Sequence, residues 1–218
     1  MLVAIDTATD RASLALHDGY RVRTEHTWDA PRRHTVELTP RLSEAMERLG
    51  VGYDKLSAVA VTTGPGSFTG LRVGLSVAKG LSVARRLPLV GIPTLDVLAA
   101  GQGRDRRPLV AVLQAGRGRI SVVTYRWQLG EWKAQEEPRL TTWSAVTQEI
   151  GEPTLFCGEI DRKGADLISR LRDRAVLLPA PWRLRRAGFL AELGWKRLNQ
   201  KDVDDPASLT PVYLRYPV

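Results

Sequence analysis

The sequence predicts an α/β protein in which a βββαβα unit occurs twice, the second time in reduced form. Short apolar runs such as LVAID (2–6) and LSAVAV (56–61) are typical of central strands covered on both faces. Stretches with apolar residues every three or four positions separate them and indicate helices. In addition, residues 110–124 (VAVLQAGRGRISVVT) align with residues 2–16 (LVAIDTATDRASLAL), strand over strand and turn over turn. This alignment, which places Ser121 over Ser13, indicates a duplication.

The first copy begins with three strands, predicted at 2–6, 12–17 and 20–28. Asp18-Gly19 forms the tight turn between the second and third strands. A helix then follows from His34 to Leu49, where Gly50 ends it. The remaining elements of this half are a strand at 56–61, a helix at 70–86, a strand at 87–93 and a helix at 94–101.

The second copy repeats this order with shorter elements. Within 110–124 we expect two strands, followed by a strand at 131–137, a helix at 142–150, a strand at 154–158 and a helix at 161–172. A last helix at 187–199 precedes an extended tail. We therefore expect two domains: residues 1–101 joined by the C-terminal segment 187–218, and residues 102–186.

Two βββαβα units are the plan of the duplicated RNase H-like/actin-like ATPase (ASKHA) fold, shared by actin, sugar kinases and Hsp70-type ATPases. In that fold the turn after the first strand of each half grips phosphate, and an acidic residue there positions a metal. Asp6, Thr7 and Thr9 would form the first grip. The equivalent of Asp6 in the second half is Gln114, which brings no negative charge for Mg²⁺. Asp6 is alternatively a polar strand end bonded to local backbone.

Other catalytic chemistry finds little support in the sequence. A nuclease of the RNase H type needs three or four carboxylates, and only Asp6 and Glu44 are candidates. The three histidines lack a metal-binding spacing, and no base accompanies a nucleophile. The single cysteine, Cys157, favours a reducing cytoplasm, and neither a signal peptide nor a membrane-spanning run is found.

The loop TTGPGSFTGLRVG (62–74) is not a Walker A loop, because no Gly-Lys-Ser/Thr follows its glycines. Gly64, Gly66 and Gly70 also miss the dinucleotide spacing, and Pro65 lacks the N–H that a phosphate cradle would use. We interpret the loop as a sharp strand-to-helix reversal in which Ser67 or Thr69 caps the helix. An anion at that helix N-terminus is the alternative.

The helix at 70–86 has two packing surfaces. Gly70, Gly74, Ala78 and Ser82 form a smooth stripe, and Val73, Val77, Leu81 and Ala84 form a second apolar face. One surface suits the helix's own sheet, and the other would face water unless something covers it. The cover is either a partner protein or another helix of this chain, at 34–49 or at the C-terminus.

The net charge of +8 comes with basic clusters at 104–107, 117–119, 162–174 and 183–186. They fit either a nucleic-acid partner or a generally arginine-rich solvated surface.

Five segments together resemble the TsaB (YeaZ) family: AIDTATDRASLAL (4–16), PRRHTVELTP (31–40), TTGPGSFTGLRVGLSVAKGL (62–81), LPLVGIPTLDVLA (87–99) and PVYLR (211–215). The resemblance implies two actin-like halves, the second degraded, and a non-catalytic role in making threonylcarbamoyladenosine in tRNA. It implies pairing with a TsaD-like catalytic subunit, joined by a TsaE-like ATPase, with ATP and metal on those partners and tRNA bound through the complex. The histidine pair with which TsaD binds its metal is absent here, and no cofactor is expected on this chain.

The resemblance also implies that pairing uses the two helices of the first half. The expected interface residues are Val36, Leu42, Met46, Gly70, Val73, Gly74, Val77, Ala78 and Leu81. A homodimer through the same surface is plausible for the chain alone. The chain departs from the family at Gln114, where an acid is common. The rivals are an ATP-dependent kinase or ATPase of the actin/sugar-kinase superfamily and a basic tRNA-binding module acting alone.

Overall fold

The computed structural model describes residues 1–214 and divides into two compact units. The first comprises Met1–Val97 and Arg186–Tyr213, and the second comprises Leu98–Arg185. The end of the expected segment 187–218, including Arg215 of the PVYLR motif, lies outside the described residues. None of the helices within residues 1–214 combines the length and the apolar character that crossing a membrane requires.

The first unit contains a five-stranded mixed sheet with the strand order β3-β2-β1-β4-β5. The strands β1 (Leu2–Asp6), β2 (Arg11–His17) and β3 (Val22–Asp29) form an antiparallel meander, as predicted. The strands β4 (Ala58–Gly64) and β5 (Leu89–Pro93) run parallel to β1. Every residue of β1 and β4 is buried, which explains the apolar runs LVAI and AVAV with which they begin.

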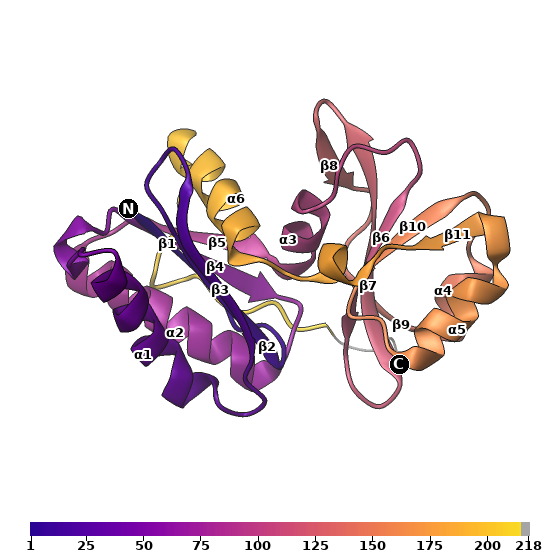
Figure 1. Ribbon diagram of the computed structural model, residues 1–218, viewed down its shortest axis with the longest axis horizontal. Helices are drawn as coiled ribbons and strands as arrows, with labels where there is room; N and C mark the ends of the chain where they lie inside the picture. Colours follow the sequence, from indigo (N-terminus) through magenta and orange to yellow (C-terminus); the bar gives the residue numbers. More distant parts are fainter. Residues whose placement is uncertain (215–218) are drawn as a thin grey trace. The chain divides into compact units, whose positions relative to one another are not determined.

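Helices cover both faces of this sheet (Figure 1). On one face, α1 (His34–Arg48) and α2 (Phe68–Arg85) bury a core that includes Val3, Leu38 and Leu75. On the other face, α6 (Ala187–Asn199) packs Leu190 against Leu2. The short helix α3 (Thr94–Ala100) follows β5. The chain order of this unit therefore begins βββαβα, as the sequence predicts.

The second unit contains a six-stranded sheet with the order β11-β10-β6-β7-β8, in which β9 pairs with β7. Its strands are β6 (Leu109–Gln114), β7 (Arg119–Gln128), β8 (Glu131–Ala134), β9 (Arg139–Thr142), β10 (Thr154–Gly158) and β11 (Ala175–Leu177). Its helices are α4 (Trp143–Gln148) and α5 (Arg162–Arg170), with short 3₁₀ turns at Arg172–Arg174 and Ala180–Arg183; a third such turn, Tyr53–Lys55, lies in the first unit.

The reduction of the second copy lies in its helices rather than in its sheet. The helices α4 and α5 have 6 and 9 residues, whereas α1 and α2 have 15 and 18. The strands β9 and β11 were not predicted, because they are only 4 and 3 residues long. The predicted strand at 131–137 ends at Ala134.

The hairpins of the two units differ by one residue. Asp6 pairs with Ser13 in the first unit, whereas Gln114 pairs with Ile120 in the second. The turn of the second hairpin is therefore one residue shorter, and Ser121 pairs with Leu113 instead. The alignment of Ser121 with Ser13 was wrong, because a single offset cannot accommodate a shortened turn.

Candidate functional site

The turn after β1 is held by bonds within the first unit. Asp6 is buried, and its Oδ1 accepts the Ala8 N–H at 2.9 Å and the Thr62 hydroxyl at 3.0 Å. The Thr7 hydroxyl donates to the carbonyl of Gly70 at 2.7 Å. Asp6 and Thr7, which were expected to bind phosphate, thus form hydrogen bonds within their own unit. This arrangement fits the alternative interpretation, in which Asp6 is a polar strand end bonded to local groups.

The remaining candidates for chemistry are likewise in local contacts. His34 Nε2 donates to the carbonyl of Thr9 at 2.8 Å, and His17 Nε2 lies 3.0 Å from Glu192 Oε1. Burial raises the pKa of the Cys157 thiol, so the reactive thiolate is disfavoured. Among residues 1–214, no three His, Cys, Asp or Glu side chains come together in a way that could hold a metal ion.

The glycines of the loop before α2 lie against the backbone of the same unit. Gly64 has a φ of +122°, which favours glycine, and a Cβ on Gly66 would lie 2.4 Å from the carbonyl oxygen of Ala8. The Ser67 N–H donates to the same oxygen at 2.6 Å. Ser67 Oγ accepts the Gly70 N–H at 3.3 Å, which confirms Ser67 as the helix cap. Close packing therefore accounts for these glycines.

The position in the second unit that corresponds to Asp6 is occupied by a polar network. Gln114 donates its backbone N–H to Glu159 Oε2 at 3.2 Å and its side-chain amide to the Glu159 carbonyl at 2.9 Å. Glu159 Oε1 accepts from Arg185 at 2.7 Å, and the Arg185 side chain is only 2% exposed. A carboxylate is thus present, but a buried guanidinium already neutralises it. No local sequence pattern signals this network, because Glu159 lies 45 residues from Gln114.

The small-residue stripe of α2 faces the unit's own core. A Cβ on Gly70 would lie 2.2 Å from the Thr7 carbonyl oxygen, and one on Gly74 would lie 2.3 Å from Thr7 Oγ1. Several residues expected at a partner interface are therefore buried within their own unit. These buried residues are Leu42, Met46, Gly70, Gly74 and Ala78.

The other expected interface residues are accessible. Val36 on α1 is 63% exposed, and Val73, Val77 and Leu81 on α2 are half-buried. Between the two helices runs a shallow groove of about 440 Å³, lined by Thr35, Phe68, Thr69, Arg72, Val73, Ser76 and Val77. We call Val36, Phe68, Val73, Val77 and Leu81 the α1/α2 surface. Thr69 lies in this groove and does not cap the helix.

An aromatic cluster borders the groove, and sequence analysis missed it. Phe68 is 55% exposed, and its ring lies 5.1 Å from that of Tyr213. The Arg72 guanidinium stacks on Phe68 at 3.6 Å and donates to the Tyr213 hydroxyl at 3.0 Å. The Val212 N–H bonds to the Thr63 carbonyl at 2.7 Å and fixes this tail segment. No local pattern signals a contact between residues 141 positions apart.

Comparisons with known proteins agree on one family. The model of the family "TsaD: tRNA N6-adenosine threonylcarbamoyltransferase" matches residues 28–147, more than half of the chain. The tRNA threonylcarbamoyladenosine biosynthesis protein TsaB of Escherichia coli K12 is 32% identical over 82% of this chain and 81% of its own length. The TsaB protein of Bacillus subtilis 168 is 27% identical over 98% of this chain and 93% of its own.

Solved structures show the same fold. A Pseudomonas aeruginosa protein described as similar to peptidase YEAZ matches with a TM-score of 0.81 and 27% identity, covering 98% of this chain and 99% of that one. The activator of 2-hydroxyisocaproyl-CoA dehydratase from Clostridium difficile, solved with bound ADPNP, has a TM-score of 0.52 and 10% identity, covering 94% and 98%. At 10% identity the similarity to the activator concerns the fold alone. It confirms the predicted actin-like (ASKHA) fold.

Proposed function

Because the chain belongs to the TsaB (YeaZ) family, we propose that it is the non-catalytic subunit of a tRNA N6-threonylcarbamoyladenosine synthase. In this role it binds and supports a TsaD-like catalytic subunit during threonylcarbamoyl transfer to the adenosine beside the anticodon. ATP and metal belong to the partners, which include a TsaE-like ATPase.

The polar groups at the two strand ends support a non-catalytic role. Phosphoryl transfer requires charge to be cancelled from both sides of the transferred group. In the first unit the Asp6 carboxylate accepts bonds from Ala8 and Thr62. In the second unit the Glu159 carboxylate is paired with Arg185. Mg²⁺ at either place would compete with these bonds for the carboxylate.

The single observation that carries the pairing role is the α1/α2 surface. Val36 on α1 is 63% exposed, and Phe68 at the start of α2 is 55% exposed. The TsaD family model spans both helices, so a TsaD-like partner would offer equivalent helices. Related chains can then pair about a pseudo-twofold axis, and two copies of this chain can do so when the partner is missing. A specific contact of this kind needs about 800 Å² from each side.

The test is co-purification of the chain with its TsaD homologue, followed by titration of the pair. We expect Val36→Glu and Val77→Glu to weaken pairing at least ~30-fold, because each would bury a charge in an apolar contact. Val36 is exposed, so its replacement leaves the fold intact. Ala78→Glu is unsuitable, since Ala78 is fully buried and the change would unfold the unit.

Val203→Glu is the matched control. Val203 is 47% exposed and lies after α6, outside α1 and α2, so the change adds the same charge away from the assigned surface. We expect it to pair as the wild type does. Undiminished pairing by folded Val36→Glu and Val77→Glu proteins would refute the assigned surface. Failure of the wild-type chain to bind the TsaD homologue would refute the function.

A further inference from the structure

A groove in the second unit is lined by charged side chains of α5. Its volume is about 440 Å³, and its lining residues are Ser144, Arg162, Lys163, Asp166, Leu167 and Arg170. The α5 residues follow the spacing of one helix face, while Gly164 and Ile168 on the opposite side are buried.

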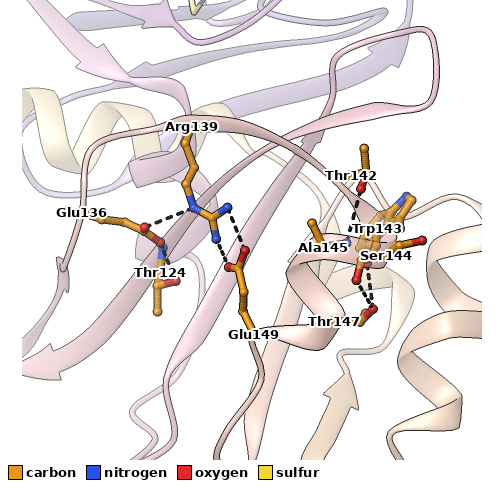
Figure 2. A network of polar contacts seen from close by, with 9 residues as sticks. All are labelled: Thr124, Glu136, Arg139, Thr142, Trp143, Ser144, Ala145, Thr147 and Glu149. Atoms are coloured by element: carbon orange, nitrogen blue, oxygen red, sulfur yellow. Dashed lines mark hydrogen bonds and ion pairs between the residues drawn. The ribbon is translucent and has the colours of Figure 1, made fainter. Parts of the chain in front are cut away.

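The walls of the groove are held by the close approach of α4 and α5. A Cβ on Gly164 would lie 2.4 Å from the Trp143 ring, so only glycine allows this contact. At the start of α4, Thr142 Oγ1 accepts the Ala145 N–H at 3.3 Å, and the Thr147 hydroxyl donates to the Trp143 carbonyl at 2.8 Å (Figure 2). These bonds fix the turn that carries Ser144.

The cations of the groove have no carboxylate partners within residues 1–214. Arg162, Lys163 and Arg170 are exposed, and none of them forms an ion pair with another described residue, although Asp166 lies among them. Arg139 of the same unit differs from these cations, because it forms ion pairs with the carboxylates of Glu136 and Glu149 (Figure 2). The charge of the groove is therefore available to an anionic partner.

We propose that this α4/α5 groove binds the phosphate backbone of tRNA. Arg162 and Arg170 are eight residues apart, a rise of about 12 Å along the helix. This distance is long enough for the two arginines to reach different phosphates along one strand of a duplex arm. Lys163 and the Ser144 hydroxyl supply further donors of the kind that contact phosphate. The choice of tRNA as the polyanion rests on the proposed function.

The composition of the groove favours RNA over an anionic membrane. A helix that lies on a membrane buries large apolar side chains beside its cations. Among the described residues that line the groove, only Leu167 is apolar, and it is half-buried and packs on the core of the unit.

The experiment measures binding of tRNA to the full chain by fluorescence anisotropy over a range of KCl concentrations. Arg162→Ala, Lys163→Ala and Arg170→Ala are combined in one triple variant. Each phosphate contact contributes about one unit to the slope of log K against log salt, so we expect the slope to fall by about 3. Affinity at about 0.1 M salt should fall at least ~10-fold. Arg162→Lys with Arg170→Lys keeps the charge and should retain the wild-type slope.

The matched control replaces Arg104, Arg106 and Arg117 with alanine. These arginines are exposed in the same unit, so the control loses the same charge. We expect its affinity to change less than ~3-fold. Equal losses of tRNA affinity in the two triple variants would show that binding follows net charge. An unchanged slope of log K against log salt in the groove variant would show that RNA does not contact the groove. Either result would overturn the proposal.

Two further measurements separate this proposal from the proposed function and from lipid binding. The groove variant should still pair with the TsaD homologue, and loss of RNA binding with normal pairing supports the proposal. Absence of salt-dependent tRNA binding by both the wild-type chain and its complex would overturn it. So would groove-dependent binding to phosphatidylserine vesicles without groove-dependent binding to tRNA.

Discussion

The packing of α2 on the turn after β1 makes a specific prediction for Gly74→Ala. A methyl group at Gly74 would lie 2.3 Å from Thr7 Oγ1, which is shorter than any real contact between such atoms. Thr7 is buried, and its hydroxyl donates to the carbonyl of Gly70 at 2.7 Å. To accept the methyl group, Thr7 must move and this hydrogen bond must break.

The expected change combines three contributions to the free energy of unfolding. Losing the hydrogen bond costs about 1 kcal/mol, and fitting an extra methyl group into a packed core costs about 1–3 kcal/mol. Alanine is better than glycine within a helix by about 1 kcal/mol, which offsets part of the loss. The net destabilisation is about 1–3 kcal/mol. For a chain of this size it lowers Tm by about 2–12 °C.

Gly80 provides the control on the same helix. It is exposed, and a Cβ there would meet nothing within 4 Å. Gly80→Ala should therefore stabilise the protein by about 0.5–1 kcal/mol. Thermal unfolding followed by circular dichroism should move the two melting temperatures in opposite directions.

A double-mutant cycle measures the coupling between Thr7 and Gly74. Thr7→Ala removes the hydroxyl that clashes, so Gly74→Ala should be far less harmful in that background, with a coupling of at least ~1 kcal/mol. A rise in Tm for Gly74→Ala similar to that of Gly80→Ala would refute the packing of α2 on Thr7.

Three further predictions concern charged residues. Asp6→Ala should lower the free energy of unfolding by about 2–3 kcal/mol, because two buried donors lose their acceptor. Isothermal titration of the wild-type chain with Mg-ATP should show no tight binding. Tight binding by the wild type that is lost in Asp6→Ala would instead support an ATP-dependent kinase or ATPase. The side-chain hydrogen bond from Arg107 lowers the pKa of Asp105 to about 2. Because the pKa of Asp105 is lower in the folded than in the unfolded protein, its ionised carboxylate stabilises the fold. This contribution is present above pH ~4 and is lost as the pH falls towards 2. The difference in Tm between the wild type and Asp105→Asn should therefore shrink over that range, and a constant difference would contradict the assignment. Glu159→Ala removes this carboxylate from the buried Arg185 guanidinium and should destabilise the second unit by about 3 kcal/mol, measured by urea unfolding; a change below ~1 kcal/mol would show that the pair is unimportant.

Most of the secondary structure could be predicted because its signals are local. The meander of the first unit follows from apolar runs and the Asp18-Gly19 turn, and α1 ends at Arg48 beside the predicted stop at Gly50. The cap at Ser67 likewise depends only on the residues next to it. The strands β9 and β11 were missed because they are short, and what makes them strands is pairing with β7 and β10.

The candidate sites were predicted less well because they depend on which face of an element is buried. Periodicity shows that α2 has two packing surfaces, but either could have faced the sheet. Thr7 packs against Gly70 and Gly74, so the small-residue stripe of α2 is the buried face. Val73 and Val77 therefore line the groove.

The sequence by itself determined the duplicated α/β plan, the family and the absence of an acid at Gln114, since each is written in neighbouring residues or in a motif. Only the tertiary structure decided that Arg185 neutralises Glu159 and that Tyr213 contacts Phe68. It also decided that Arg139 pairs with two carboxylates while Arg162, Lys163 and Arg170 of α5 pair with none among residues 1–214. These are contacts between side chains that approach one another only after folding. Their energies depend on distances that no spacing along the chain encodes.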